Sequence, residues 1–341
     1  LAPPVMLAQL IQALYNIVDS LFVGKYADSG LTALSIVYPL QLLMIALAVG
    51  TGVGVNTVMA ARLGIGRKKQ AAEYAGVATP MALVMWLAFA GICWCIMPFY
   101  ARVSSQSPDV IRDVVTYGRI VCLCSTGLFL ESVWTKVHQA NGDMKTPMAA
   151  QILGAVTNIV LDPLLIFGLF GLPRLGIAGA AIATVIAQAL SAVLVLVVLT
   201  RTQGSYRIVW KGMRMDKGIL RNMFWIGIPS ALQLAITSFS NVFVQSYVNR
   251  FASSCMAGWA AYQKIDAFAI LPMTTLSVSA TTFVGQNVGA GNWDRAKQGI
   301  RTAMAMATVI TLIILVPLMI FAGPLCSLFN QETEVIGYGV Y

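Results

Sequence analysis

Long apolar runs without charge constrain this chain more than any other feature. Met81–Phe99 and Ile177–Leu199 each extend for about 20 residues without a charged side chain, enough to cross a bilayer as a helix. Of the 341 residues, 58% are hydrophobic and only 10% are charged, whereas soluble domains carry about 25% charged residues. A soluble fold could not cover its surface with so few polar groups. We therefore expect an all-α polytopic membrane protein.

The hydropathy pattern predicts nine helices, and the charges between them predict their orientation. The predicted helices are residues 4–24, 34–61, 75–100, 114–140, 148–170, 177–199, 219–249, 256–284 and 296–322. Fifteen Lys and Arg residues lie near the ends of the even-numbered predicted helices, on one side of the membrane. Only five lie on the opposite side. Because cytoplasmic loops carry the excess of Lys and Arg, the N-terminus is predicted to be cytoplasmic. The net charge of +9 then reflects topology, and no nucleic-acid partner is expected.

An internal repeat organises the chain into two halves. A constant shift of 225 residues superimposes polar and glycine positions without a gap: Pro4 on Pro229, Asn16 on Asn241, Gly64 on Gly289, Gly66 on Gly291 and Ala71 on Ala296. The copies run parallel, as in transporters related by an axis along the membrane normal. We predict an N-terminal lobe at 1–200, a cytoplasmic linker at 201–218 and a partial C-terminal lobe at 219–341. The second copy lacks three helices of the first, so the expected parent has two six-helix bundles, with about nine of twelve helices present here.

Polar stripes mark three of the predicted helices. Asp19 ends a stripe at i, i+3, i+4 and i+7 that also contains Gln12, Tyr15 and Asn16. A second stripe contains Gln151, Asn158 and Asp162, and a third contains Thr184 and Gln188. Ionisable side chains in a membrane span are unfavourable and usually functional. Because lipid would reject these faces, we expect all three to point into one cavity of the N-terminal lobe.

Two carboxylates in one low-dielectric site cannot easily both stay ionised without a cation between them. Asp19 and Asp162 are therefore predicted to share a proton, or an all-oxygen cation such as Na⁺ with carboxylate, amide and hydroxyl ligands. No other cofactor is expected. The alternative is a hydrogen-bond cluster that only holds helices together.

Other ionisable residues have less certain partners in the sequence. Glu131 is expected either to line the cavity as a substrate-binding or proton-relay acid or to pair with a neighbouring helix. Lys264 and Asp266 are two residues apart and face different ways. His138 is expected at the surface. Pro163 follows Asp162 directly, where a proline can kink the helix and free a carbonyl.

The sequence contains no enzymatic constellation, neither a nucleophile elbow, an HExxH motif nor a phosphate loop, so we do not expect an enzyme. Gly64-Ile-Gly66 and Gly289-Ala-Gly291 are interpreted as cap or hinge turns at helix ends. The six cysteines are interpreted as small buried hydrophobes, since the partners in each Cys-X-Cys pair point to different helix faces.

Several motifs together resemble the MATE (multidrug and toxic compound extrusion) family. They are Tyr15-Asn16-Ile-Val-Asp19, Ala61-Arg62-Leu-Gly64-Ile-Gly66, Gly142-Asp-Met-Lys-Thr-Pro147, Asn158-Ile-Val-Leu-Asp162-Pro163, Gly179-Ala-Ala-Ile-Ala-Thr184 and Gly285-Gln-Asn-Val-Gly-Ala-Gly291. The resemblance implies V-shaped lobes and export of cationic drugs in exchange for H⁺ or Na⁺. It also implies a coupling-cation site at Asp19, Asn158 and Asp162, the possible Na⁺ ligands, with Thr184 beside them. Gln12, Tyr15, Asn16, Glu131 and Gln151 are then the expected cavity residues. Some members carry a glutamate where this chain has Thr237, so a cation site in the second lobe is not expected from the match.

The main alternative is a lipid-linked oligosaccharide flippase of the same superfamily. Such a flippase would need a basic cavity for pyrophosphate, whereas the spans are expected to bury mostly acids and no arginine. A receptor or membrane-embedded enzyme would leave the repeat and the paired acids unexplained. The expected partners are small cationic drugs and the lipid bilayer, with the protein a monomer in a bacterial inner membrane.

Overall fold

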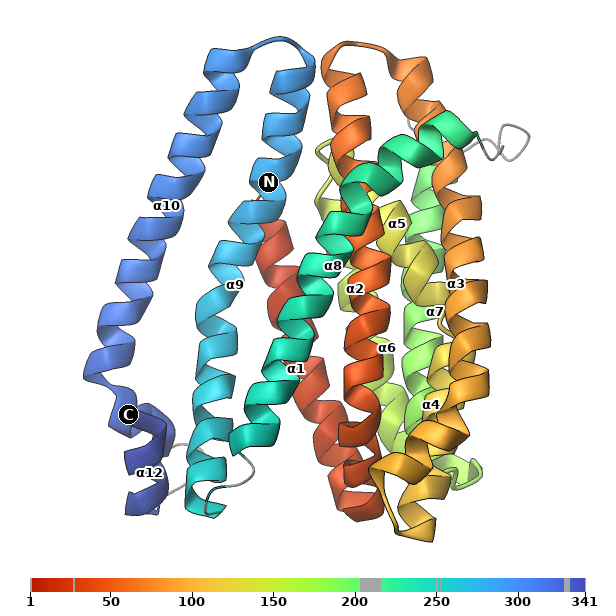
Figure 1. Ribbon diagram of the computed structural model, residues 1–341, viewed down its shortest axis with the longest axis vertical. Helices are drawn as coiled ribbons and strands as arrows, with labels where there is room; N and C mark the ends of the chain where they lie inside the picture. Colours follow the sequence, from red (N-terminus) through yellow and green to blue (C-terminus); the bar gives the residue numbers. More distant parts are fainter. Residues whose placement is uncertain are drawn as a thin grey trace.

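The computed structural model describes residues 2–26, 28–202, 216–248, 251, 253–327 and 332–340, and every regular element in these ranges is a helix (Figure 1). The long elements are α1 (Ala2–Tyr26), α2 (Asp28–Gly64), α3 (Lys68–Ser104), α4 (Pro108–Leu123), α5 (Thr126–Ala140), α6 (Lys145–Phe167), α7 (Ile177–Arg201), α8 (Lys217–Val248), α9 (Ser253–Gly289) and α10 (Trp293–Ile320). Three short elements complete the set: the 3₁₀ helix η1 (Leu169–Gly171), α11 (Ala322–Ser327) and α12 (Thr333–Val340).

The all-α polytopic class is confirmed by the length and apolarity of these helices. Within the described residues, six helices can cross a membrane on those grounds: α2, α3, α6, α7, α8 and α10. The bent pair α4 and α5 makes a seventh span when it is counted as one. Most of the predicted linker, residues 203–215, lies outside the described ranges.

The single helix predicted at 114–140 is wrong, because the chain breaks there into α4 and α5. The two halves meet at Cys124 and Ser125 with a bend of 41°. Trp86 Nε1 donates to the Leu123 carbonyl at 2.9 Å, and the Ser125 hydroxyl donates to the Cys122 carbonyl at 2.7 Å. These side chains occupy carbonyls that a continuous helix would bond internally, which stabilises the break. By contrast, α6 continues through Pro163 to Phe167.

The repeated Gly-X-Gly turns cap equivalent helices. Gly66 lies two residues beyond the end of α2 with φ 81°, and Gly291 lies two residues beyond the end of α9 with φ 74°, a conformation that glycine adopts without strain. Arg67 N donates to Arg62 O at 3.0 Å, and Asn292 N donates to Asn287 O at 2.9 Å. Both pairs span five residues as in a Schellman cap, and they differ by the same 225-residue shift. The interpretation as cap turns is confirmed.

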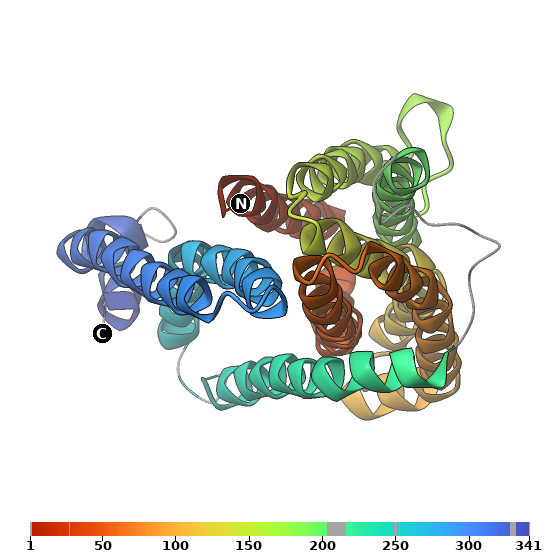
Figure 2. The ribbon, with the colours of Figure 1, turned by 90° about the horizontal axis from the view of Figure 1, so that it is seen from above.

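The helices from α1 to α7 form one bundle, and α8 runs along its side (Figures 1 and 2). Glycine brings α8 against α2: a Cβ on Gly50 would overlap the backbone of Ala231, and a Cβ on Gly54 would overlap the Met223 carbonyl. Viewed from above, α9 and α10 lie to one side of the bundle (Figure 2), and α9 contacts α2 and α1. The hydroxyls of Thr274 and Thr275 tie α9 to α1 by donating to Gln9 Oε1 at 2.8 and 3.1 Å.

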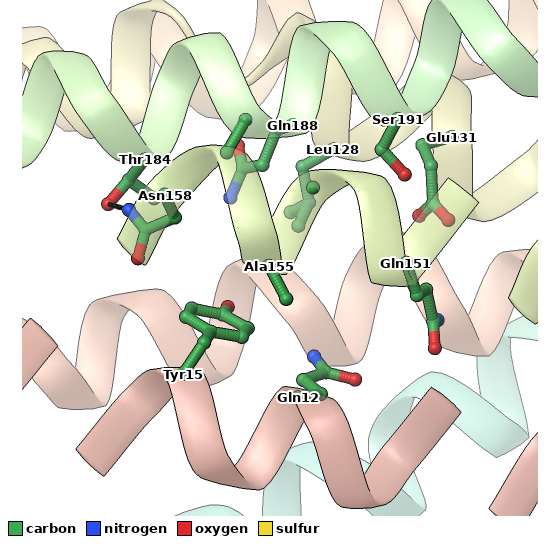
Figure 3. A pocket seen from close by; sticks show the side chains of 12 residues that line it. Gln12, Tyr15, Leu128, Glu131, Gln151, Ala155, Asn158, Thr184, Gln188 and Ser191 are labelled. Carbon is green, nitrogen blue, oxygen red and sulfur yellow. Dashed lines mark hydrogen bonds between the residues drawn. The ribbon is translucent and has the colours of Figure 1, made fainter. Parts of the chain in front are cut away.

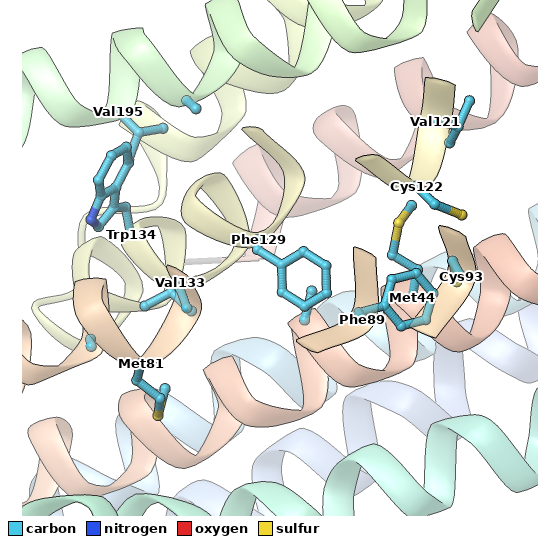
Figure 4. Close-up of a cluster of buried hydrophobic side chains, with 14 of the residues drawn as sticks. Met44, Met81, Phe89, Cys93, Val121, Cys122, Phe129, Val133, Trp134 and Val195 are labelled. Atoms are coloured by element: carbon cyan, nitrogen blue, oxygen red, sulfur yellow. The ribbon is translucent and has the colours of Figure 1, made fainter. Parts of the chain in front are cut away.

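The buried core of the first bundle joins α2, α3, α4, α5 and α7 (Figure 4). Phe89 and Phe129 pack with ring centroids 6.1 Å apart, and Trp134 Nε1 donates to Thr79 Oγ1 at 2.9 Å. Cys93 and Cys122 belong to this core, whereas Cys95 and Cys124 are exposed. The opposite orientations within each Cys-X-Cys pair are therefore confirmed, but the expectation that all six cysteines are buried is wrong for Cys95 and Cys124, which point out of the bundle. This packing fixes α5 and α7, which carry part of the site.

Candidate functional site

A pocket of about 550 Å³, a volume that includes its open mouth, lies between α1, α5, α6 and α7 (Figure 3). Most of its lining residues are of polar types, and they come from all four helices. The lining residues are Gln12, Tyr15, Leu128, Glu131, Gln151, Gly154, Ala155, Asn158, Thr184, Ala187, Gln188 and Ser191. Six of the residues predicted for a shared cavity are among them. The predicted convergence of the three polar stripes is therefore what the structure shows.

The α1 stripe reaches this pocket through Gln12 and Tyr15. Seven residues after Gln12, Asp19 lies deeper between the helices, and its Oδ1 is buried without a hydrogen-bond partner among the described residues. The side chain of Asn16, which was also predicted to line the cavity, lies outside the described part of the chain.

The α6 stripe places Asn158 and Asp162 one turn apart, with exposed fractions of 1% and 0%. The Asn158 amide donates to Asp162 Oδ1 at 3.3 Å and to Thr184 Oγ1 on α7 at 3.4 Å. Thr184 donates its own hydroxyl hydrogen to Ala180 O at 3.0 Å, so it faces Asn158 as an acceptor. Asn158 therefore links the acid on α6 to α7.

The carboxyl groups of Asp19 and Asp162 lie close enough to share a hydrogen bond. Three oxygens of this cluster are buried and have no donor in the described chain: Asp19 Oδ1, Asp162 Oδ2 and Asn158 Oδ1. Two carboxyls in contact need a proton or a cation between them, and unpaired buried oxygens need a donor or a cation. The donor set of carboxylate, amide and hydroxyl oxygens fits H⁺ or a hard cation such as Na⁺.

Glu131 on α5 lines the pocket on the side away from this cluster (Figure 3). Its Oε1 accepts a hydrogen bond from Thr135 at 3.0 Å. The sequence left open whether Glu131 faces the cavity or pairs with another helix, and the structure places it in the cavity. Asp266 on α9 does not line the pocket, and the side chain of Lys264 lies outside the described residues.

Two basic residues lie where the sequence predicted none. Arg119 on α4 lies within the predicted 114–140 span, with its guanidinium 4.2 Å from the ring centroid of Trp94. Lys136, counted above with a connector, is 7% exposed inside α5 and donates to Gln139 Oε1 at 2.9 Å. The expectation of spans without arginine is therefore wrong. Neither residue lines the pocket.

His138 is also misplaced by the sequence prediction, because it is 0% exposed rather than at the surface. Its Nδ1 lies 2.9 Å from Asp143 Oδ2, and its Nε2 lies 3.3 Å from the Val195 carbonyl. Asp143 also accepts the amides of Lys145 and Thr146, both at 3.1 Å, at the start of α6. Burial raises the pKa of Asp143, but the hydrogen bonds from His138 and Thr146 outweigh it and hold the pKa well below its ordinary value.

Gln188 of the third stripe lines the pocket as predicted, whereas the sequence prediction missed several other lining residues, of which Ser191 is polar. Thr184, Gln188 and Ser191 stand at i, i+4 and i+7, so helical periodicity alone could have found Ser191. The small residues Gly154, Ala155 and Ala187 carry no such signal in an apolar helix.

A family model described as MatE matches residues 4–164 and 229–340, which together make up most of the chain. The chain belongs to the MatE family. The two matched stretches begin at residues 4 and 229, which reproduces the 225-residue shift and confirms the repeat. A second model, described as Lipid II flippase MurJ, matches residues 113–228.

Two relatives of this MatE chain are named as a multidrug resistance protein and a transporter. The chain is 27% identical over 337 residues to the "Probable multidrug resistance protein YoeA" of Bacillus subtilis, covering 98% of this chain and 73% of that protein. It is 28% identical over 329 residues to the "FAD transporter" of Shewanella oneidensis, covering 94% and 71%.

Solved structures confirm the fold of the MatE chain. An outward-facing MATE transporter of the MOP superfamily superimposes with a TM-score of 0.92 at 24% identity, covering all of this chain and 75% of that one. A MOP superfamily transporter from Pyrococcus furiosus gives a TM-score of 0.90 at 23% identity with the same coverage.

Proposed function

We propose that this chain belongs to a secondary active transporter that exports cationic amphipathic compounds in exchange for H⁺ or Na⁺ by alternating access. The observation that carries the proposal is the group of buried, unpaired oxygens on Asp19, Asp162 and Asn158 beside the pocket. We further propose a monomer in a bacterial inner membrane. The excess of Lys and Arg in the connectors after the even-numbered predicted helices supports a cytoplasmic N-terminus.

The coupling step follows from the charges of this pair. Without a cation, two ionised carboxylates repel each other in a medium of low dielectric constant. Proton or Na⁺ binding removes that repulsion and fills the unpaired oxygens of Asp19, Asp162 and Asn158. The loaded and empty states of α1 and α6 therefore differ in free energy. A difference of a few kcal/mol between conformations is enough to couple ion and substrate.

The charge of the pocket supports a cationic substrate. Glu131 is the only charged residue among the lining residues, and no Lys or Arg lines the pocket in the described part of the chain. Relatives named as multidrug resistance proteins support a small-molecule substrate, without indicating its charge. A lipid flippase is the second candidate, supported by the match to the MurJ model. Its pyrophosphate substrate would require basic groups, and Arg119 lies over Trp94 rather than in the pocket.

Ion-driven drug efflux from proteoliposomes tests the proposal, with wild type compared with Asp19→Asn and Asp162→Asn. We expect a pH or Na⁺ gradient to drive efflux in wild type and neither variant to sustain it. Glu73→Gln changes an exposed acid on α3 and is the matched control. Full efflux in both aspartate variants would show that Asp19 and Asp162 do not couple ion and substrate and have only a structural role. Loss of efflux in Asp266→Asn alone would move the coupling site to the second lobe.

A further inference from the structure

One arginine lies on the outward face of the first bundle, within a membrane span. The buried side of α4 includes Tyr117 and Val121. Arg119 lies two residues from each of them, so on a helix of about 3.6 residues per turn it points to the opposite face. Figures 1 and 2 show α3 and α4 on the side of the bundle away from α9 and α10.

The surroundings of Arg119 on this face are apolar and exposed. Its guanidinium lies 4.2 Å from the ring centroid of Trp94 on α3, and Trp94 is 47% exposed. Leu87 and Phe99 on the same helix are also exposed. Large apolar side chains exposed together on a membrane-spanning bundle are a surface for lipid. The Arg119 guanidinium therefore lies at the lipid-facing surface.

The depth of Arg119 in the span lets its charge approach one membrane surface. Trp94 lies eight residues before Arg102, the next charged residue on α3, which is about 12 Å along the helix axis. Helical side chains tilt toward the N-terminus of their own helix. Since α4 begins at Pro108, just after α3 ends, the Arg119 side chain tilts toward that same surface. Its charged end can then approach the lipid phosphates while its stem stays in hydrocarbon.

Arg119 has no anionic partner in the described part of the chain. Asp109 Oδ1 lies 3.4 Å from Arg112 Nη2, and Asp113 Oδ1 lies 3.7 Å from Arg112 Nε. Of the three guanidinium nitrogens of Arg119, only Nε is buried without a hydrogen-bond partner, so the two terminal NH₂ groups are left for a ligand outside the helices. Charged residues in a span usually face the interior of a bundle and pair there. A cation on the outward face without such a pair indicates a ligand from the membrane.

We propose that Arg119 and Trp94 bind the phosphate of an anionic phospholipid, in the leaflet on the side of the α3–α4 connector. Two NH₂ groups of a guanidinium match two phosphate oxygens in a bidentate pair that an ammonium group cannot form. The ring of Trp94 supports one face of the guanidinium, and tryptophan is itself enriched at the level of the head groups. This site goes beyond the proposed function, because it lies outside the pocket and does not depend on which ion or compound is transported.

The charge of the head group decides which phospholipid binds best. In a zwitterionic phospholipid an ammonium group lies beside the phosphate and competes with Arg119 for it. Phosphatidylglycerol has no such cation. Basic residues near a membrane surface also attract anionic lipids in general, and the exposed Arg102 lies at the end of α3. Arg102 therefore provides a comparison between general attraction and a specific site.

Lipid titrations of the purified, delipidated protein, followed by native mass spectrometry, test the site. The probes are dioleoyl phosphatidylglycerol and dioleoyl phosphatidylcholine, which share acyl chains and phosphate but differ in net charge. We expect wild type to bind phosphatidylglycerol more tightly than phosphatidylcholine. Phosphatidylglycerol should bind Arg119→Gln about tenfold more weakly than wild type, as the loss of one to two charge-assisted hydrogen bonds predicts. Arg119→Lys keeps the charge but not the bidentate geometry and should lie between the two. Arg102→Gln is the matched control.

Equal affinity of wild type for the two lipids would overturn the inference. An equal loss of affinity in Arg119→Gln and Arg102→Gln would also overturn it, because general electrostatic attraction would then explain the binding. Displacement of phosphatidylglycerol by inorganic phosphate would assign the site to free phosphate instead of a lipid. If Arg119→Gln does not fold, Trp94→Leu must still weaken phosphatidylglycerol binding, since it removes the ring that supports the guanidinium.

Discussion

Gly64 and Gly289 occupy equivalent positions in the two repeats and lie at the same crossing of α2 and α9. A Cβ on Gly64 would overlap the carbonyl oxygen of Gln286, and a Cβ on Gly289 would overlap that of Ala61. Gln286 and Ala61 are themselves 225 residues apart, so the contact obeys the symmetry of the repeat. The two halves therefore meet through backbone, at a separation that only glycine permits.

Substitution of Gly64 or Gly289 by alanine should force α2 and α9 apart. Overpacking of this kind destabilises by about 1–3 kcal/mol, and we expect a lower thermal unfolding midpoint in detergent for both variants. Gly91→Ala is the matched control, because its Cβ would meet nothing within 4 Å. An unchanged midpoint for Gly64→Ala would mean that the crossing loosens without loss of stability.

Asp143→Asn should destabilise the protein at neutral pH and have little effect in acid. The folded-state pKa of Asp143 lies below its ordinary value, so its contribution to stability is present above the ordinary carboxyl pKa and is lost as pH falls toward the folded value. As the side chain is 26% exposed, we expect a loss of only about 1 kcal/mol at pH 7.

Unfolding midpoints of wild type and Asp143→Asn, measured from pH 7 downward, check this prediction. The two curves should begin to converge below about pH 4 and meet only as pH approaches the lowered folded-state pKa. Asp109→Asn serves as the control, since Asp109 pairs with Arg112 at 3.4 Å on an exposed surface. A constant difference between the curves at all pH values would show that the ionised carboxylate is not what stabilises this turn.

Trp86→Phe should weaken the break between α4 and α5. The variant keeps the aromatic ring but leaves the Leu123 carbonyl without the indole donor at 2.9 Å. Loss of this partly buried hydrogen bond should cost about 1 kcal/mol and lower the thermal midpoint. Trp225→Phe, at a residue that is 80% exposed, should change it little. Equal effects of the two substitutions would contradict a role for the Trp86 hydrogen bond.

Hydropathy and the 225-residue repeat predicted much of this fold because both act through local pattern. The helix break at Cys124–Ser125 was not predictable in this way, since α4 and α5 form one apolar run. What stabilises the break is Trp86, which is 37 residues from Leu123 in sequence. The break therefore depends on tertiary contact, which hydropathy does not encode.

In the candidate site, too, local patterns could be predicted from the sequence and tertiary contacts could not. The stripes of Gln12, Gln151 and Thr184 were visible because polar residues on apolar helices have a preferred direction. His138 was placed at the surface because it lies near the end of a predicted helix. That position does not reveal its hydrogen bonds with Asp143 and the Val195 carbonyl in the interior. Arg119 was overlooked because a single charge hardly changes the hydropathy of a span.

Thr184 offers a test of how Asn158 serves the proposed coupling site. Thr184→Val removes the oxygen that accepts from the Asn158 amide at 3.4 Å, whereas Thr184→Ser keeps it. Without this partner the amide is no longer held between Asp162 and α7. Loss of one such hydrogen bond is worth about 1 kcal/mol, so ion-driven efflux at low ion concentration should fall about fivefold in Thr184→Val and stay near wild type in Thr184→Ser. The measurement is initial efflux rate against ion concentration in proteoliposomes. A shift in apparent ion affinity with an unchanged maximal rate would place Thr184 in ion binding, and identical curves for the two variants would exclude its hydroxyl from that role.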